Sequence, residues 1–221
     1  MPKANFVGVS RLATMNERTE VVRQFEDLIA DYAGALYGVA VESCSAALLL
    51  SCLYCKVKEV TIPRHTYFSV PCSIIHAGGT VAFEDRPWTG AYQLKPYPIW
   101  DSAVRFKERM YMPGTFYCLS FQSSKHVPIG RGGMILTNDP AAKRWFERMR
   151  NDGRGQCPKE QDDPRDIMLG YNMYMTPEQA ARGIDLFYWR IYGKTDLPDI
   201  CRPYSDLSLV PAYTAKKGAH S

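Results

Sequence analysis

Apolar residues near the start of the chain recur at the spacing of one helix face. A capping box at Thr14-Met15-Asn16-Glu17 precedes them, and Gly34 follows as a stop. This pattern predicts an amphipathic helix of about five turns. The apolar positions are Val21, Val22, Phe25, Leu28, Ile29 and Tyr32.

After this helix, short apolar stretches alternate with helix-like stretches. We predict strands at residues 39–41, 59–63, 80–84, 99–101, 115–121 and 133–137, and helices at residues 46–55, 67–76, 140–150 and 177–192. Such alternation is typical of an α/β fold with a mostly parallel sheet flanked by helices on both faces. Thr176 and Pro177 form a strong helix start.

Two segments lack this periodicity. Residues 151–166 are rich in Gly, Pro, Asp and Lys, and we interpret them as a surface loop. From residue 195 onward, we expect either a small extra element or a segment that covers a partner subunit. The predicted organisation is one α/β domain at residues 1–192 and a short C-terminal remnant or tail at residues 193–221.

Composition limits the classes of function. The chain has 221 residues, 46% of them apolar, and 27 basic against 23 acidic residues. The net charge of +4 is mild and not clustered, which gives no support to nucleic-acid or membrane-surface binding. No apolar run approaches the ~18 residues of a membrane span, and no signal-peptide stretch is visible. We expect a soluble cytoplasmic protein.

The seven cysteines, at residues 44, 52, 55, 72, 118, 157 and 201, form no framework. We interpret them as reduced and mostly buried thiols. Cys52 and Cys55 have the spacing of a metal or redox pair, but no second pair or His cluster follows. A structural role in the core is favoured over a site, and no metal is expected.

Two polar positions follow short apolar strands. The turn Ser43-Cys44-Ser45 opens a buried helix, and the free N–H groups of a helix N-terminus suit a phosphate. Serine is also an ordinary helix cap. Asp101 ends the strand at 99–101, where its carboxylate could pair with a protonated ring nitrogen or cap the next turn.

Two further positions could carry chemistry. Lys125 lies just beyond the strand at 115–121, among small and polar neighbours. Desolvation there would lower the amine pKa and free the lone pair for Schiff-base chemistry, although a solvated surface lysine is the commoner case. Asn172 follows a Gly-Tyr turn, where it is either a turn former or a residue that reaches a ligand.

Taken in order, these residues resemble the DegT/StrS family of sugar aminotransferases, in the fold type I class that depends on pyridoxal 5′-phosphate (PLP). Residues 43–48 read Ser-Cys-Ser-Ala-Ala-Leu, similar to the family's Ser-Gly-Thr-Ala-Ala-Leu phosphate turn. Residues 101–103 match Asp-x-Ala. Other matching stretches lie at residues 25–34, 62–67, 120–139 and 170–181.

The resemblance implies a role for each matched residue. Lys125 would form the internal aldimine with PLP and shuttle a proton between carbon centres. Asp101 would keep the ring nitrogen protonated, so that the ring acts as an electron sink. Tyr67 would stack on the ring.

The resemblance also implies a phosphate site and a partner. Cys44, Ser45 and Ser120 would hold the cofactor phosphate. Asn172 would reach the phosphate of a neighbouring subunit, which implies a homodimer with shared active sites.

Several departures from the family pattern are visible. The stretch between residues 85 and 99 is much shorter than in relatives, and the C-terminal part is vestigial. Val104 stands where relatives carry His or Gln, Tyr174 where they carry Arg, and Arg131 where they usually carry an acid. A shortened large domain leaves apolar surface that dimerisation could cover.

Two functions follow from these features. The leading hypothesis is a PLP-dependent aminotransferase that moves an amino group from glutamate to a nucleotide-linked keto-sugar. The alternative is a degenerate paralogue that binds PLP without turnover.

Overall fold

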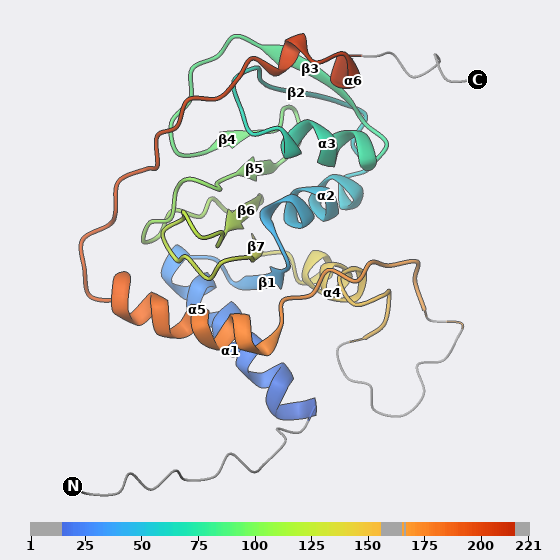
Figure 1. The fold of residues 1–221 in the computed structure, drawn as a ribbon. Coiled ribbons are helices and arrows are strands. Elements are labelled where there is room, and N and C mark those ends of the chain that lie inside the picture. The colour runs from blue at the N-terminus through green and yellow to red at the C-terminus, as the bar shows by residue number, and fades with distance from the viewer. Residues whose placement is uncertain (1–14, 156–164, 166, 215–221) are drawn as a thin grey trace, which may run out of the picture.

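A sheet of β-strands with helices on both faces forms the centre of the molecule (Figure 1). The computed structural model describes residues 15–155, 165 and 167–214. The helices are α1 (Met15–Ala33), α2 (Cys44–Tyr54), α3 (Ser69–His76), α4 (Pro140–Met149), α5 (Pro177–Arg190), α6 (Pro211–Thr214) and the 3₁₀ helix η2 (Leu207–Leu209). The strands are β1 (Tyr37–Val41), β2 (Glu59–Pro63), β3 (Thr80–Glu84), β4 (Tyr92–Gln93), β5 (Ile99–Asp101), β6 (Phe116–Ser120) and β7 (Gly133–Thr137).

The strands form a mixed sheet in which one direction dominates. Five strands follow the order β1-β7-β6-β5-β4, and β2 and β3 form a parallel pair. Paired backbone hydrogen bonds between Thr61 of β2 and Lys95, just after β4, link the two groups. Strands β4 and β7 run opposite to the other described strands. The α/β prediction is therefore confirmed, with a mixed sheet.

Alternate residues of each central strand enter two separate cores. In β1, Val39 and Val41 pack in the core that contains α2, α3 and α4, whereas Ala40 faces the core formed with α1 and α5. In β6, Cys118 faces the first core and Leu119 the second. This period of two is what a sheet covered on both faces requires.

A buried ion pair joins α1 to the end of α4. The guanidinium of Arg150 contacts the Glu26 carboxylate and the Ala40 carbonyl. Both charged residues are buried, Arg150 at 5% exposed and Glu26 at 4% exposed. The Glu26 carboxylate also accepts a hydrogen bond from the Ala40 N–H, 2.8 Å long. Burial raises the pKa of Glu26, and the charge of Arg150 opposes that rise.

The chain after α5 returns along the sheet toward β3 (Figure 1). Its η2 segment is fixed by a hydrogen bond from the Leu207 N–H to the Arg64 carbonyl, 2.9 Å long. Tyr213 of α6 donates to the Phe68 carbonyl at 3.1 Å. The C-terminal segment thus packs against its own chain and supplies small extra elements.

The predicted elements are confirmed with small shifts at their ends. The helix expected from residue 67 begins at Ser69, which leaves Tyr67 in a loop. Strand β4 was not predicted, because two residues give too short a pattern. Most of the expected loop at 151–166 lies outside the described residues. No helix in the described ranges is long and apolar enough to cross a membrane.

Candidate active site

A pocket of about 320 Å³ opens where several strands end. Asp101 ends β5, Ser120 ends β6, and Cys44 follows β1. The carboxyl ends of strands that share a direction meet at one edge of a sheet, where ligands bind. The lining residues are 43–45, 48, 66, 67, 69, 70, 88, 101, 103, 104, 120, 122, 125, 130–132, 202 and 204.

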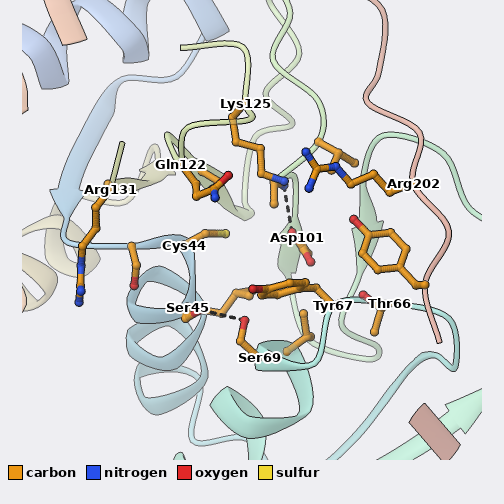
Figure 2. A pocket seen from close by; sticks show the side chains of 18 of the residues that line it. Cys44, Ser45, Thr66, Tyr67, Ser69, Asp101, Gln122, Lys125, Arg131 and Arg202 are labelled. Carbon is orange, nitrogen blue, oxygen red and sulfur yellow. Dashed lines mark hydrogen bonds between the residues drawn. The ribbon is translucent and has the colours of Figure 1, made fainter. Parts of the chain in front are cut away.

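Lys125 enters the pocket from the turn after β6. Its backbone N–H donates to the Gln122 carbonyl at 2.9 Å, which fixes the turn. Figure 2 shows the side chain extending toward Asp101. Burial lowers the pKa of Lys125, the charge of Arg202 lowers it further, and Cys44 and Asp101 oppose the change. A lowered pKa makes the neutral, nucleophilic form of the amine easier to reach than in a solvated lysine.

Asp101 lies at the floor of the pocket and is 5% exposed. It accepts hydrogen bonds from the Ala103 N–H at 3.0 Å and from the Tyr92 hydroxyl at 2.9 Å. Burial raises the pKa of Asp101, while these two hydrogen bonds and Lys125 favour its charged form. Tyr92 is itself hydrogen-bonded to Thr66. The carboxylate is thus held in one orientation.

The N-terminus of α2 forms one wall of the pocket. The Ser43 side chain caps the helix by accepting from the Ala46 N–H at 3.1 Å. The preceding N–H groups of Cys44 and Ser45 have no acceptor within the helix, which makes this end suited to an anion. Gly133 of β7 lets the backbone at Ser43 lie close to the sheet, because a Cβ at Gly133 would lie 2.3 Å from the Ser43 carbonyl carbon.

The side chains on this wall are mostly hydrogen-bonded. The Cys44 thiol donates to the Cys118 carbonyl at 3.6 Å, and burial raises its pKa well above the usual value. The Cys44 side chain is therefore a protonated wall residue. Ser45 donates to the Ser69 hydroxyl at 2.8 Å, and Ser120 lines the same pocket.

Tyr67 lies on the opposite side of the pocket from Lys125 (Figure 2). Its ring is about half exposed and lies beside the Phe68 ring, with the two centroids 4.2 Å apart. An exposed aromatic face next to a pocket suits a flat ring of a ligand.

Asn172 does not line this pocket. It is exposed and pairs through its backbone with Asn151. The other six predicted site residues, Cys44, Ser45, Tyr67, Asp101, Ser120 and Lys125, line one pocket. Their roles toward a cofactor stay predictions.

Three residues that line the pocket and one that lies beneath it were missed by sequence reasoning. Tyr92 supports Asp101 from β4, a strand too short to predict. Arg202 and Tyr204 come from the C-terminal segment, and no motif marks them. Arg131, noted only as a departure, lines the pocket and pairs with Glu42 at 2.6 Å.

Burial shifts the Cys52 and Cys55 thiols away from the reactive thiolate form. Burial raises the pKa of Cys52 to about 12 and that of Cys55 to about 11, opposite to the shift of reactive thiols. Within the described ranges, no group of three or more His, Cys, Asp or Glu side chains could hold a metal ion. Cys157 lies outside the described residues.

The family model for DegT/DnrJ/EryC1/StrS aminotransferases matches residues 6–96 and 108–187, more than half of the chain. The chain belongs to this family. The DegT/StrS resemblance is therefore confirmed. A search of curated protein sequences gave no match.

Three solved structures give the same fold at low identity. DesV of S. venezuelae, in complex with a ketimine intermediate, has a TM-score of 0.63, 18% identity, and coverage of 76% of this chain and 56% of DesV. DesI, determined in the presence of its TDP-sugar product, has a TM-score of 0.63 and 20% identity, and the match covers 76% of this chain and 53% of DesI. NtdA of Bacillus subtilis, with bound cofactor PMP, has a TM-score of 0.61 and 17% identity, and the match covers 76% of this chain and 48% of NtdA.

The fold of this DegT/StrS member is that of the PLP-dependent fold type I transferases. The chain spans about half the length of these solved relatives. At these identities the likeness establishes the fold alone.

Proposed function

We propose that this DegT/StrS member binds PLP in the pocket, with Lys125 as the attachment amine. The observation that carries the proposal is the convergence of the Lys125 amine, the Asp101 carboxylate and the N-terminus of α2 on one pocket. These are the three groups that an aldehyde, a protonated ring nitrogen and a phosphate would each need.

The proposed roles follow from the environment of each residue. When bound, PLP supplies an electron sink for bonds at an amine-bearing carbon. Asp101 holds a proton at the ring nitrogen, and Tyr92 and the Ala103 N–H keep the carboxylate aimed. Lys125, with its lowered pKa, accepts and returns a proton at the reacting carbon. The free N–H groups of Cys44 and Ser45, with the Ser120 hydroxyl, bind phosphate oxygens.

The proposed reaction is amino transfer from glutamate to a nucleotide-linked keto-sugar. Family membership supports the reaction class. The DesI structure, determined with its TDP-sugar product, supports the substrate class. Two features favour the alternative, a PLP-binding paralogue without turnover. They are the short segment between β3 and β5, and the presence of Val104.

Spectroscopy and turnover separate these possibilities. Adding PLP to the purified chain should produce a visible absorption band that Lys125→Ala lacks and that Lys58→Ala, at an exposed surface lysine, retains. Glutamate should then abolish the band, and a keto-sugar should restore it. A band that persists after glutamate is added would support the paralogue, and no band with wild type would refute both functions.

The proposal includes a homodimer in which Asn172 serves the partner's pocket. Asn172 is exposed and lies beside large exposed apolar residues, of which Leu169 is 94% exposed and Tyr174 is 46% exposed. Apolar groups left in water favour association. Mixing Lys125→Ala chains with Asn172→Ala chains should restore PLP binding, because each mixed dimer contains one intact site. A monomeric mass by light scattering, or no restoration, would contradict this arrangement.

A further inference from the structure

Residues 196–204, which we call the strap, cross the rim of the pocket beyond the family-matched region. One end is held by Asp199, whose carboxylate binds Arg105 at 2.7 Å and Lys107 at 3.5 Å and whose side chain is 9% exposed. The Ile200 N–H donates to the Val104 carbonyl at 2.9 Å. The strap is thus fixed to the loop that follows β5.

Two further contacts hold the strap beside the pocket. His126, the residue after Lys125, donates from Nε2 to the Pro198 carbonyl at 3.0 Å. At the other end, His65 donates from Nδ1 to the Tyr204 carbonyl at 3.1 Å, and the Tyr204 ring stacks on Trp88. The strap is therefore anchored on both sides of Arg202, which is itself an exposed residue.

Arg202 lies between these anchors and lines the pocket. Figure 2 shows its guanidinium directed toward the end of Lys125, on the side of the pocket away from Ser45. Within residues 15–155, 165 and 167–214, no hydrogen bond or ion pair involves the Arg202 side chain. Arg131, the other arginine of the pocket, is neutralised by Glu42.

Two cationic side chains facing one another are unfavourable without an anion between them. The effect is visible at Lys125, where the charge of Arg202 adds to burial in lowering the amine pKa. A guanidinium fork matches the paired oxygens of a carboxylate or a phosphate. The N-terminus of α2 already offers an anion site across the pocket. An anion held by Arg202 therefore belongs to a different chemical group from the one bound at α2.

We propose that Arg202 binds an anionic group of the substrate, a carboxylate or a phosphate, beside Lys125. The inference rests on the proposed function, because that function makes the bound anion part of a substrate. It adds a recognition residue that lies outside the family match. Anion binding also neutralises Arg202, so it couples substrate arrival to the protonation of Lys125.

The test uses the cofactor-free 221-residue chain, so that failure to bind PLP does not affect it. The rate of acylation at Lys125, measured by mass spectrometry of its peptide, is followed against pH. Succinate probes for a carboxylate and inorganic pyrophosphate for a phosphate. In wild type, a binding anion should move the midpoint of the pH profile upward, because it removes the effect of Arg202 on the amine.

Variants at the two pocket arginines distinguish the outcomes. Arg202→Gln should raise the midpoint without any anion and weaken the anion response about tenfold or more. Arg202→Lys, which keeps the charge and loses the fork, should retain part of the response. Arg131→Gln should respond like wild type. A response to succinate alone would identify a carboxylate, and a response to pyrophosphate alone a phosphate.

Two results would overturn the proposal. One is an unchanged midpoint in wild type with both anions. The other is an anion response of equal strength in Arg202→Gln, which would place the anion at α2. Because PLP attachment is measured separately, loss of the proposed function and loss of this anion site give different signatures.

Discussion

Replacing Tyr92 by Phe removes a single hydroxyl from beneath the site. That hydroxyl donates to Asp101 at 2.9 Å and contacts Thr66, and the Tyr92 side chain is fully buried. Phenylalanine keeps the buried ring, so the change is confined to the two contacts of the hydroxyl. Asp101 would keep only its hydrogen bond from the Ala103 N–H.

The expected loss follows from the charge of the acceptor. A hydrogen bond to a charged group contributes about 1.5–3 kcal/mol, and a buried acceptor left short of donors does not recover it from water. Each kcal/mol lowers the melting temperature of a chain of this size by about 2–4 °C. The pKa of Asp101 should also rise further, because the Tyr92 hydrogen bond lowers it. PLP should then bind more weakly, since its ring nitrogen loses part of its anionic partner.

Urea unfolding and PLP titration, monitored by absorbance, measure the two effects. Tyr97→Phe is the matched control, because the Tyr97 hydroxyl accepts a hydrogen bond from the Lys58 N–H, 2.8 Å away at an exposed site. It should lose about 1 kcal/mol or less and leave PLP affinity unchanged. If Tyr92→Phe matched wild type in both measurements, or behaved like Tyr97→Phe, the reasoning about Asp101 would be refuted.

Three other predictions concern the supports of the site. Arg150→Met should lower the free energy of unfolding by about 3–5 kcal/mol in urea titrations, because it strands the buried Glu26 carboxylate; a loss below about 1 kcal/mol would contradict this. Gly133→Ala should lower stability by about 1–3 kcal/mol and weaken PLP binding, since its Cβ would strike the Ser43 backbone; unchanged binding would be the contrary result. Hydrogen bonds from an arginine lower the pKa of Asp199, so its stabilisation is present above the ordinary pKa of aspartate and lost as pH falls through the lowered value. The difference in unfolding free energy between wild type and Asp199→Asn should therefore shrink on acidification, and a constant difference would contradict the assignment.

Residues that end a strand were the predictable part of the site. Asp101 and Ser120 each follow an apolar run, and parallel strands bring such ends to one edge. Lys125 follows the same run within a few residues. Local pattern and shared strand direction therefore suffice to bring these three positions together.

Contacts between distant segments could not be predicted. Tyr92 reaches Asp101 through the β4–β5 pairing, which two strand residues are too few to indicate. Arg202 reaches the pocket because Asp199 pairs with Arg105, a contact that depends on the folded path of the strap. Sequence periodicity reports which face of an element is buried, and it carries no information on where an irregular segment docks.

The most direct test of the account is the site at which PLP becomes attached. The chain is mixed with PLP, reduced with borohydride, digested, and examined by mass spectrometry. We predict one dominant modified peptide, which contains Lys125, and its loss in Lys125→Ala. A label spread over several lysines, or absent from the Lys125 peptide, would contradict the central claim.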